Sequence, residues 1–282
     1  MPFEPPANER LLTLLERVAG ALERLAPEAL AAVNWASSPA YVWSAAGARA
    51  VERLEAPALD LLRGIDSQKE RVVANVTRFA AGTAAHDMLL WGSRGMGKSA
   101  LLRAAVRDAQ ERGPERIALV QVGQEALSTV PSLFVELGQH DRRFLVFVDD
   151  LGFEDDDLSG PRLLRSWLEG GVEARPANVR LAVTSNRRAI VARSLSEQDD
   201  PINPRDAVDD RLALADRFGL SIGFHNCTQD DYLAIIDGYA ARFGLAWQAA
   251  DAIEWAQRRG ARSGRVAWQY IAELAGRSGQ AV

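Results

Sequence analysis

The segment Gly92–Ser99 constrains the fold of this chain more than any other stretch. It matches the pattern Gly-x-x-x-x-Gly-Lys-Ser/Thr, in which glycines let successive backbone N–H groups turn toward a bound phosphate. Residues 86–91 before it include an apolar run suited to a buried strand, and residues 100–106 after it are strong helix formers. Strand, glycine loop and helix in this order predict a phosphate-binding loop, because the helix adds the positive end of its dipole.

The side chains of this loop have expected roles in binding a nucleotide and Mg²⁺. The Lys98 ammonium is placed to reach the β- and γ-phosphates, and the Ser99 hydroxyl to bind the metal. The residues predicted to bind the nucleotide here are Gly92, Ser93, Arg94, Gly95, Met96, Gly97, Lys98, Ser99 and Ala100. The alternative is a glycine turn that binds no ligand, which the flanking strand and helix disfavour.

Composition limits the class of protein. With 282 residues, 48% of them hydrophobic, the chain can form one large domain or two small ones. The net charge of −5 and the lack of a long basic run argue against a surface that binds nucleic acid throughout, and leave a local patch open. The single cysteine, Cys227, excludes an internal disulfide and favours a reducing compartment. No signal-like or membrane-length apolar segment is found, which predicts a cytoplasmic protein without a membrane partner.

Periodicity divides the chain into three regions. Residues 1–63 are expected to be a helical segment, in which residues 8–26 form an amphipathic helix that packs on its own protein or contacts a partner subunit. Residues 64–226 alternate helices and strands, which predicts a parallel sheet of five strands covered by helices. Residues 227–282 carry only helical patterns and are expected to form a second, helical unit.

The expected strands are 87–91, 116–122, 144–149, 179–185 and 220–224. The expected helices of the last two regions are 66–79, 98–112, 129–140, 160–169, 206–218, 228–243, 247–259 and 263–275. Asp66 or Ser67 is predicted to cap the first of these helices, since both side chains can accept a hydrogen bond from a free backbone N–H group.

Polar residues end two further apolar strands, at the edge where the phosphate loop is also expected. Asp149 is the expected metal-side carboxylate because Mg²⁺ prefers acidic oxygen, and Asp150 is the candidate base that polarises the attacking water. Asn186 follows the strand at 179–185 and is expected to hold that water or the γ-phosphate. The competing interpretation is that these polar residues only terminate strands.

Two arginines are candidates for further contacts with the γ-phosphate. Arg217 lies where a helix is expected to end, and could reach the nucleotide of a neighbouring subunit as an arginine finger. Arg265 begins the last predicted helix and is expected to fold back onto the phosphates, with Arg262 as the second choice. Ion pairs within the chain, such as Arg217 with Asp216, are the alternative.

This ordered set of residues resembles the AAA+ ATPases over residues 62–274. The matching motifs are Gly92–Ser99 for Walker A, Asp149 and Asp150 for Walker B, Asn186 for sensor 1, Arg217 for the arginine finger and Arg265 for sensor 2. More narrowly, the chain resembles a bacterial family of ATP-binding proteins known as domain of unknown function 815. That resemblance is carried by Leu62–Asp66, Leu89–Ser99, Phe147–Leu151, Thr184–Arg188 and Asp216–Gly219.

The resemblance implies an AAA+ P-loop three-layer sandwich with ATP or ADP and Mg²⁺ bound between an α/β core and a helical lid. It implies an ATPase that remodels or loads an unidentified protein or DNA client, and a homo-oligomeric ring or filament through Arg217. Asp150 departs from the glutamate of many AAA+ proteins, so a slow or non-hydrolysing nucleotide-gated switch, or Glu154 as the base, stays open. A small-molecule kinase is a weaker alternative, because no acceptor pocket is recognised.

Overall fold

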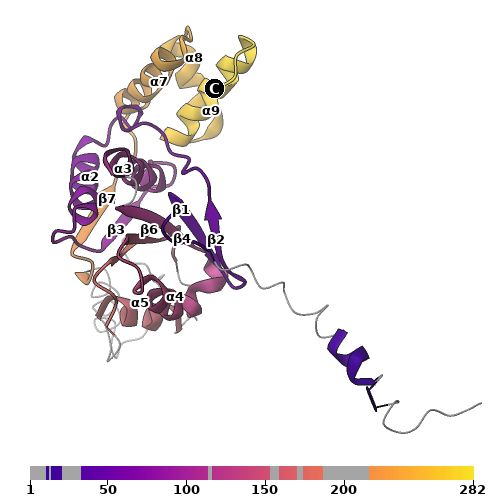
Figure 1. Cartoon of the computed structure of the whole chain (residues 1–282). Coiled ribbons are helices and arrows are strands. Elements are labelled where there is room, and N and C mark those ends of the chain that lie inside the picture. The colour runs from indigo at the N-terminus through magenta and orange to yellow at the C-terminus, as the bar shows by residue number, and fades with distance from the viewer. Residues whose placement is uncertain are drawn as a thin grey trace, which may run out of the picture.

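The computed structural model describes residues 11–12, 14–20, 33–113, 116–152, 159–169, 174–186 and 216–282 (Figure 1). Its centre is a seven-stranded sheet with the strand order β2-β1-β4-β5-β6-β3-β7. All neighbouring strands are parallel except β1 and β2. The predicted class, an α/β protein with a parallel-dominated sheet, is confirmed, whereas the predicted number of five strands is wrong.

The strands are β1 Ala40–Ser44, β2 Gly47–Val51, β3 Met88–Gly92, β4 Ile117–Val122, β5 Arg143–Val148, β6 Val179–Ser185 and β7 Leu220–Phe224. The helices are α2 Asp66–Ala80, α3 Lys98–Arg112, α4 Val130–Leu137, α5 Ser159–Glu169, α7 Gln229–Phe243, α8 Ala249–Arg259 and α9 Gly264–Arg277. Two 3-10 turns, Leu59–Leu61 and Gln124–Thr129, precede α2 and α4.

The two additional strands come from a region that the sequence pattern assigned to helix. Residues 40–51 form an antiparallel hairpin, and its first strand pairs in parallel with β4. Gly47 has a φ of 114° at the end of the hairpin turn, a conformation that glycine adopts readily. The alternation of side chains along β1 buries Tyr41 and Trp43, so both aromatic residues belong to the hydrophobic core. The helical segment predicted for residues 1–63 is therefore wrong over this hairpin, which belongs to the central sheet.

The remaining elements lie close to their predicted positions. Helix α3 and strands β6 and β7 have the expected bounds. The predicted cap of α2 is wrong, because the N-cap residue is Ile65 and no side chain accepts a bond there. The predicted helix 206–218 is described only from residue 216, and the acidic run 155–157 lies outside the described residues.

Helices cover both faces of the sheet (Figure 1). The cluster on one face joins the buried sides of α2 and α3 to residues of the lid helices α7, α8 and α9. The cluster on the other face joins α4 and α5 to the hairpin, and includes Trp35, Phe144 and Trp167. These two hydrophobic layers fix the strand ends, and so position the loops that follow β3, β5 and β6.

The lid follows β7 and is built from three packed helices. A capping box formed by Thr228 and Asp231 starts α7, and the Tyr232 hydroxyl donates to the carbonyl of Ala252 in α8 at 3.2 Å. The lone cysteine, Cys227, is buried at the start of this unit, and burial raises the pKa of its thiol to about 11. Among the described helices, none is long and apolar enough to cross a membrane.

Candidate nucleotide-binding site

The loop between β3 and α3 has the backbone geometry that its glycines permit. Gly92, Gly95 and Gly97 have φ values of 120°, 73° and 88°. A Cβ atom on Gly92 would lie 2.1 Å from the carbonyl oxygen of Phe224, the same oxygen that accepts a 3.0 Å hydrogen bond from the Ser93 N–H. Glycine is therefore required at residue 92 to bring the loop against the end of β7.

Substituting Gly92 with alanine is expected to lower the free energy of unfolding by roughly 2 to 4 kcal/mol, because positive φ and the contact with Phe224 both oppose a side chain. The matched control is Gly276→Ala in α9, where an added Cβ meets nothing within 4 Å. That control is expected to be neutral or slightly stabilising. Urea unfolding followed by circular dichroism measures both, and equal effects would contradict the requirement at residue 92.

Lys98 is the first residue of α3, and its side chain reaches back into the phosphate loop. Its ammonium donates to the carbonyls of Gly92 and Ser93 at 2.6 and 2.9 Å, and to Oδ1 of Asn186 at 3.3 Å. The side chain is buried, and burial lowers its pKa while the charges of Asp150 and Asp149 act to raise it. The cation is thus held where a phosphate of a bound nucleotide would compete with its present acceptors.

Asp149 brings together the oxygens expected around a hard cation. Its Oδ1 accepts hydrogen bonds of 2.6 Å from the hydroxyls of both Ser99 and Thr184. Mg²⁺ takes oxygen ligands and keeps several waters, so one carboxylate and one hydroxyl suffice when phosphates supply the rest. Within the described ranges, no group of three or more His, Cys, Asp or Glu could hold a metal ion. Ser99 and Asp149 therefore fit Mg²⁺ that is bound together with phosphates.

Asp150 has an unusual backbone conformation. Its φ of 52° is the one positive value of a non-glycine residue in the described part of the chain. Its N–H donates to Oγ1 of Thr184 at 2.8 Å, and its carboxylate accepts a short hydrogen bond from Nδ2 of Asn186. Asn186 therefore links Asp150, the predicted base, to Lys98. This arrangement is expected if Asp150 and Lys98 both lie beside the γ-phosphate of a bound nucleotide.

Thr184 is a residue of this site to which the sequence pattern gave no role. It is fully buried near the end of β6, and its hydroxyl contacts both Asp149 and Asp150. The signal that could have identified it is a hydroxyl two residues before Asn186, on a strand that neighbours β5. Side chains two apart on a strand share one face, so Thr184 and Asn186 both reach the loop after β5.

The lid contacts the phosphate loop directly at the start of α9. The backbone N–H of Arg265 donates to the carbonyl of Gly95 at 3.2 Å. Ser263 caps the helix by accepting from the N–H of Val266, and a Cβ atom on Gly95 would lie 2.9 Å from the Ser263 hydroxyl. Gly95 thus needs to be glycine for its positive φ and for this close approach of the lid.

A cavity of about 1110 Å³ lies between the phosphate loop, the residues before α2 and the lid. The predicted site residues that line it are Arg94, Gly95, Met96, Gly97, Lys98, Ser99, Ala100, Asp149, Asp150, Asn186 and Arg265. Its other walls include the apolar residues Leu61, Leu62, Ile65, Ile235, Tyr239, Phe243 and Trp268. The cavity therefore combines a polar end with an apolar end, as small-molecule sites commonly do.

Three of the predicted residues do not line this cavity. Gly92 and Ser93 contribute through their carbonyls, which accept from Lys98. Arg217 comes just before β7, whereas the phosphate loop follows the carboxyl end of β3, the parallel neighbour of β7. Arg217 is thus at the opposite edge of the sheet from the phosphate loop of its own chain. Glu154, the alternative base, lies outside the described residues.

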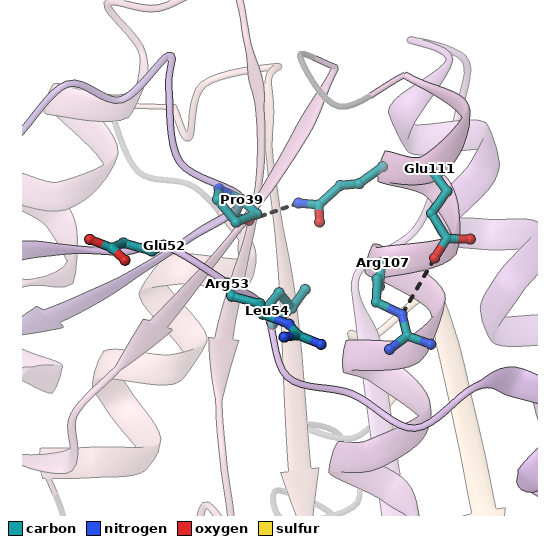
Figure 2. Close-up of a pocket in the computed structure, with 7 residues that line it drawn as sticks. Pro39, Glu52, Arg53, Leu54, Arg107 and Glu111 are labelled. Atoms are coloured by element: carbon teal, nitrogen blue, oxygen red, sulfur yellow. Dashed lines mark hydrogen bonds and ion pairs between the residues drawn. The ribbon is translucent and has the colours of Figure 1, made fainter.

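A smaller pocket of about 360 Å³ opens between the end of β2 and α3 (Figure 2). Gln110 donates to the carbonyl of Pro39 at 2.7 Å across it, and Arg107 pairs with Glu111 at 3.6 Å. Arg107 also donates to the carbonyl of Ala56 at 2.5 Å. The contact with Ala56 holds the chain between β2 and α2 on α3, and the contact with Pro39 holds the residue before β1 there. None of the predicted nucleotide-binding residues lines the pocket.

Several solved structures have a fold similar to that of this chain. The RuvB Holliday junction branch migration motor of Thermotoga maritima matches with a TM-score of 0.52 and 18% identity, over 80% of this chain and 68% of that one. Domain III of the replication initiation protein DnaA of Thermotoga maritima matches with a TM-score of 0.50 and 11% identity, over 80% of this chain and 91% of that one. The Orc1 protein of Aeropyrum pernix in complex with DNA matches with a TM-score of 0.51 and 16% identity, over 81% of this chain and 66% of that one. The fold is that of the AAA+ P-loop ATPases.

Sequence comparison places the chain in a family. None of the curated proteins matches it. The family model described as protein of unknown function, DUF815, matches residues 36–278, which include the hairpin, the phosphate loop, both acidic residues and the lid. The match also agrees with the residues on which the sequence resemblance rests. This chain, with its AAA+ fold, belongs to the DUF815 family of proteins of unknown function.

Proposed function

We propose that this protein binds ATP with Mg²⁺ in the cavity between the phosphate loop and the lid, and hydrolyses it. The observation that carries the proposal is the convergence of five side chains from three elements on one cavity, where hydrogen bonds join Ser99 to Asp149 and join Lys98 to Asp150 through Asn186. The five side chains are those of Lys98 and Ser99 from α3, Asp149 and Asp150 after β5, and Asn186 after β6. If these polar residues only terminated their strands, their side chains would not need to meet at the start of α3.

In the proposed complex the loop N–H groups and the α3 dipole hold the phosphates. Lys98 exchanges its carbonyl acceptors for phosphate oxygens, and Ser99 and Asp149 hold Mg²⁺. Bound Mg²⁺ would neutralise charge that develops on the phosphates. Asp150 polarises the attacking water, and Asn186 turns from Asp150 toward the γ-phosphate. Arg265 approaches from the lid, whose contact with Gly95 ties lid position to loop shape.

A second candidate function is a nucleotide-gated switch that hydrolyses ATP slowly. Two features of Asp150 favour it, namely a side chain one methylene shorter than glutamate and a hydrogen bond to Asn186 that occupies its carboxylate. Single-turnover hydrolysis with excess protein separates the two functions. A rate on the order of 1 s⁻¹ or more supports the first function, an ATPase with ordinary turnover. A rate several orders of magnitude lower supports the nucleotide-gated switch.

The client and the assembly are further parts of the proposal. We expect a homo-oligomer in which Arg217 of one subunit serves the nucleotide of its neighbour, because Arg217 lies away from its own phosphate loop. A protein or DNA client in the cytoplasm is proposed, and the similar structures include a branch migration motor and a protein solved with DNA. DNA is therefore the first client to test.

Changing Arg217 to alanine is expected to leave ATP affinity within about twofold and to lower the turnover of the assembled protein roughly a thousandfold. Steady-state phosphate release, measured over a range of protein concentrations, checks this. The matched control is Arg277→Ala at the end of α9, where the arginine pairs with the exposed Glu273. A wild-type turnover that does not depend on concentration, from a strictly monomeric protein, would contradict the role in trans.

A further inference from the structure

A short helix near the N-terminus carries an apolar face that the described structure leaves exposed. Residues 11–12 and 14–20 are helical, and the helix, indigo in Figure 1, stands apart from the sheet and the lid. Its large apolar side chains are 54 to 59% exposed, namely those of Leu11, Leu12, Leu14, Leu15 and Val18. Five such side chains in eight residues are far more than scattered surface apolar residues, and indicate a contact surface.

The spacing of this face fits another helix. Leu11, Leu15 and Val18 follow one another at intervals of four and three residues, and the sequence repeats these intervals at Leu22 and Leu25. Apolar residues that alternate in steps of four and three have an average period of 3.5, the period at which two helices with the same repeat pack along a common seam. Such a seam is complementary to a copy of itself.

The charges of the segment also fit a copy of itself. Glutamate followed by arginine occurs at residues 9–10, 16–17 and 23–24, so the pairs recur at intervals of seven. The three glutamates balance the three arginines, and two copies therefore meet without net repulsion. A helix that lies on an anionic membrane or binds an acidic partner typically has a basic polar face, which this segment lacks.

We infer that residues 11–20 form a helix–helix interface with the same segment of a second copy of this chain. An isolated helix of this length is marginal in water, and burial of the leucine face in the pair supplies the missing stabilisation. The segment precedes the family match, which begins at residue 36. The pairing is therefore separate from the core, and it holds subunits together whether or not nucleotide is bound, which raises the local concentration of cores for the assembly proposed above.

The test uses the full chain without nucleotide, with EDTA present, in sedimentation equilibrium over a range of concentrations. The double variant Leu15→Gln/Val18→Gln removes the centre of the apolar face while keeping net charge and, because glutamine is a good helix former, helix propensity. Its dissociation constant is expected to rise by about tenfold or more. The control Glu16→Ala/Arg17→Ala changes the opposite side of the helix, also keeps net charge, and is expected to associate like the wild type.

Titration of MgATP into the same variants keeps this inference distinct from the proposed function. The glutamine variant is expected to bind ATP like the wild type, and a failure of both proteins to bind would count against the nucleotide site alone. A wild-type chain that stays monomeric without nucleotide at about 100 μM would overturn the pairing. So would a glutamine variant that associates like the wild type, or a monomer that binds phosphatidylglycerol vesicles through this helix.

Discussion

Replacing Lys98 with alanine is expected to weaken ATP binding by roughly a hundredfold or more, as measured by isothermal titration calorimetry with Mg²⁺. The ammonium is the cation at the centre of the loop, and loss of its charge-assisted hydrogen bonds to phosphate costs on the order of 3 kcal/mol. In the ligand-free protein, removal also leaves Asp149 and Asp150 without the charge that faces them. Because removal also relieves the cost of burying the Lys98 cation, the effect on affinity should exceed the effect on folding.

The chain offers a matched control for this experiment. Lys69 is its one other lysine, and its ammonium contacts Asp66 at 2.8 Å and the carbonyl of Leu62 at 3.0 Å. Substituting Lys69 with alanine removes the same charge at the start of α2, and is expected to change ATP affinity by about threefold or less. Unchanged affinity in Lys98→Ala, with far-ultraviolet circular dichroism like that of the wild type, would remove the phosphate-binding role from this loop.

Asp150→Asn is expected to keep ATP affinity within about threefold and to lower the hydrolysis rate by roughly a hundredfold to ten-thousandfold. Asparagine has the same shape, tolerates positive φ and keeps the N–H bond to Thr184, so the backbone conformation is preserved. What it loses is the ability to accept a proton from water. Phosphate release under saturating MgATP measures the change.

Two further variants sharpen the interpretation of Asp150. Asp141→Asn, at an exposed position before β5, removes an acidic group elsewhere and should leave turnover unchanged. Asp150→Glu extends the carboxylate by one methylene, and is expected to raise turnover if the short side chain limits the wild type. If Asp150→Asn turns over like the wild type, another group is the base, and Glu154 becomes the first candidate.

Much of the fold could be predicted because the pattern is local. The glycine loop fixes where β3 ends and α3 begins, and the apolar runs of β5 and β6 end in polar residues that parallel pairing brings to the same edge. The hairpin at residues 40–51 could not be predicted in this way. Its strands are short, proline and glycine flank them, and only pairing with β4, distant in sequence, makes them part of the sheet.

The finer geometry of the site depended on contacts that no local pattern carries. The positive φ of Asp150 and the position of Thr184 arise from packing between the ends of β5 and β6. The approach of Arg265 to Gly95 depends on how the lid folds back over the core. Arg217 lies away from its own phosphate loop because it precedes β7, which pairs in parallel with β3, and periodicity alone does not determine which strands pair.

The most direct test of the central proposal is a calorimetric titration of MgATP into the wild-type chain. The account predicts saturable binding of one nucleotide per chain, weakened when EDTA removes Mg²⁺, because Ser99 and Asp149 then lose the metal that joins them to the phosphates. A folded wild-type protein that binds no ATP at nucleotide concentrations of about 1 mM, with Mg²⁺ present, would contradict the account.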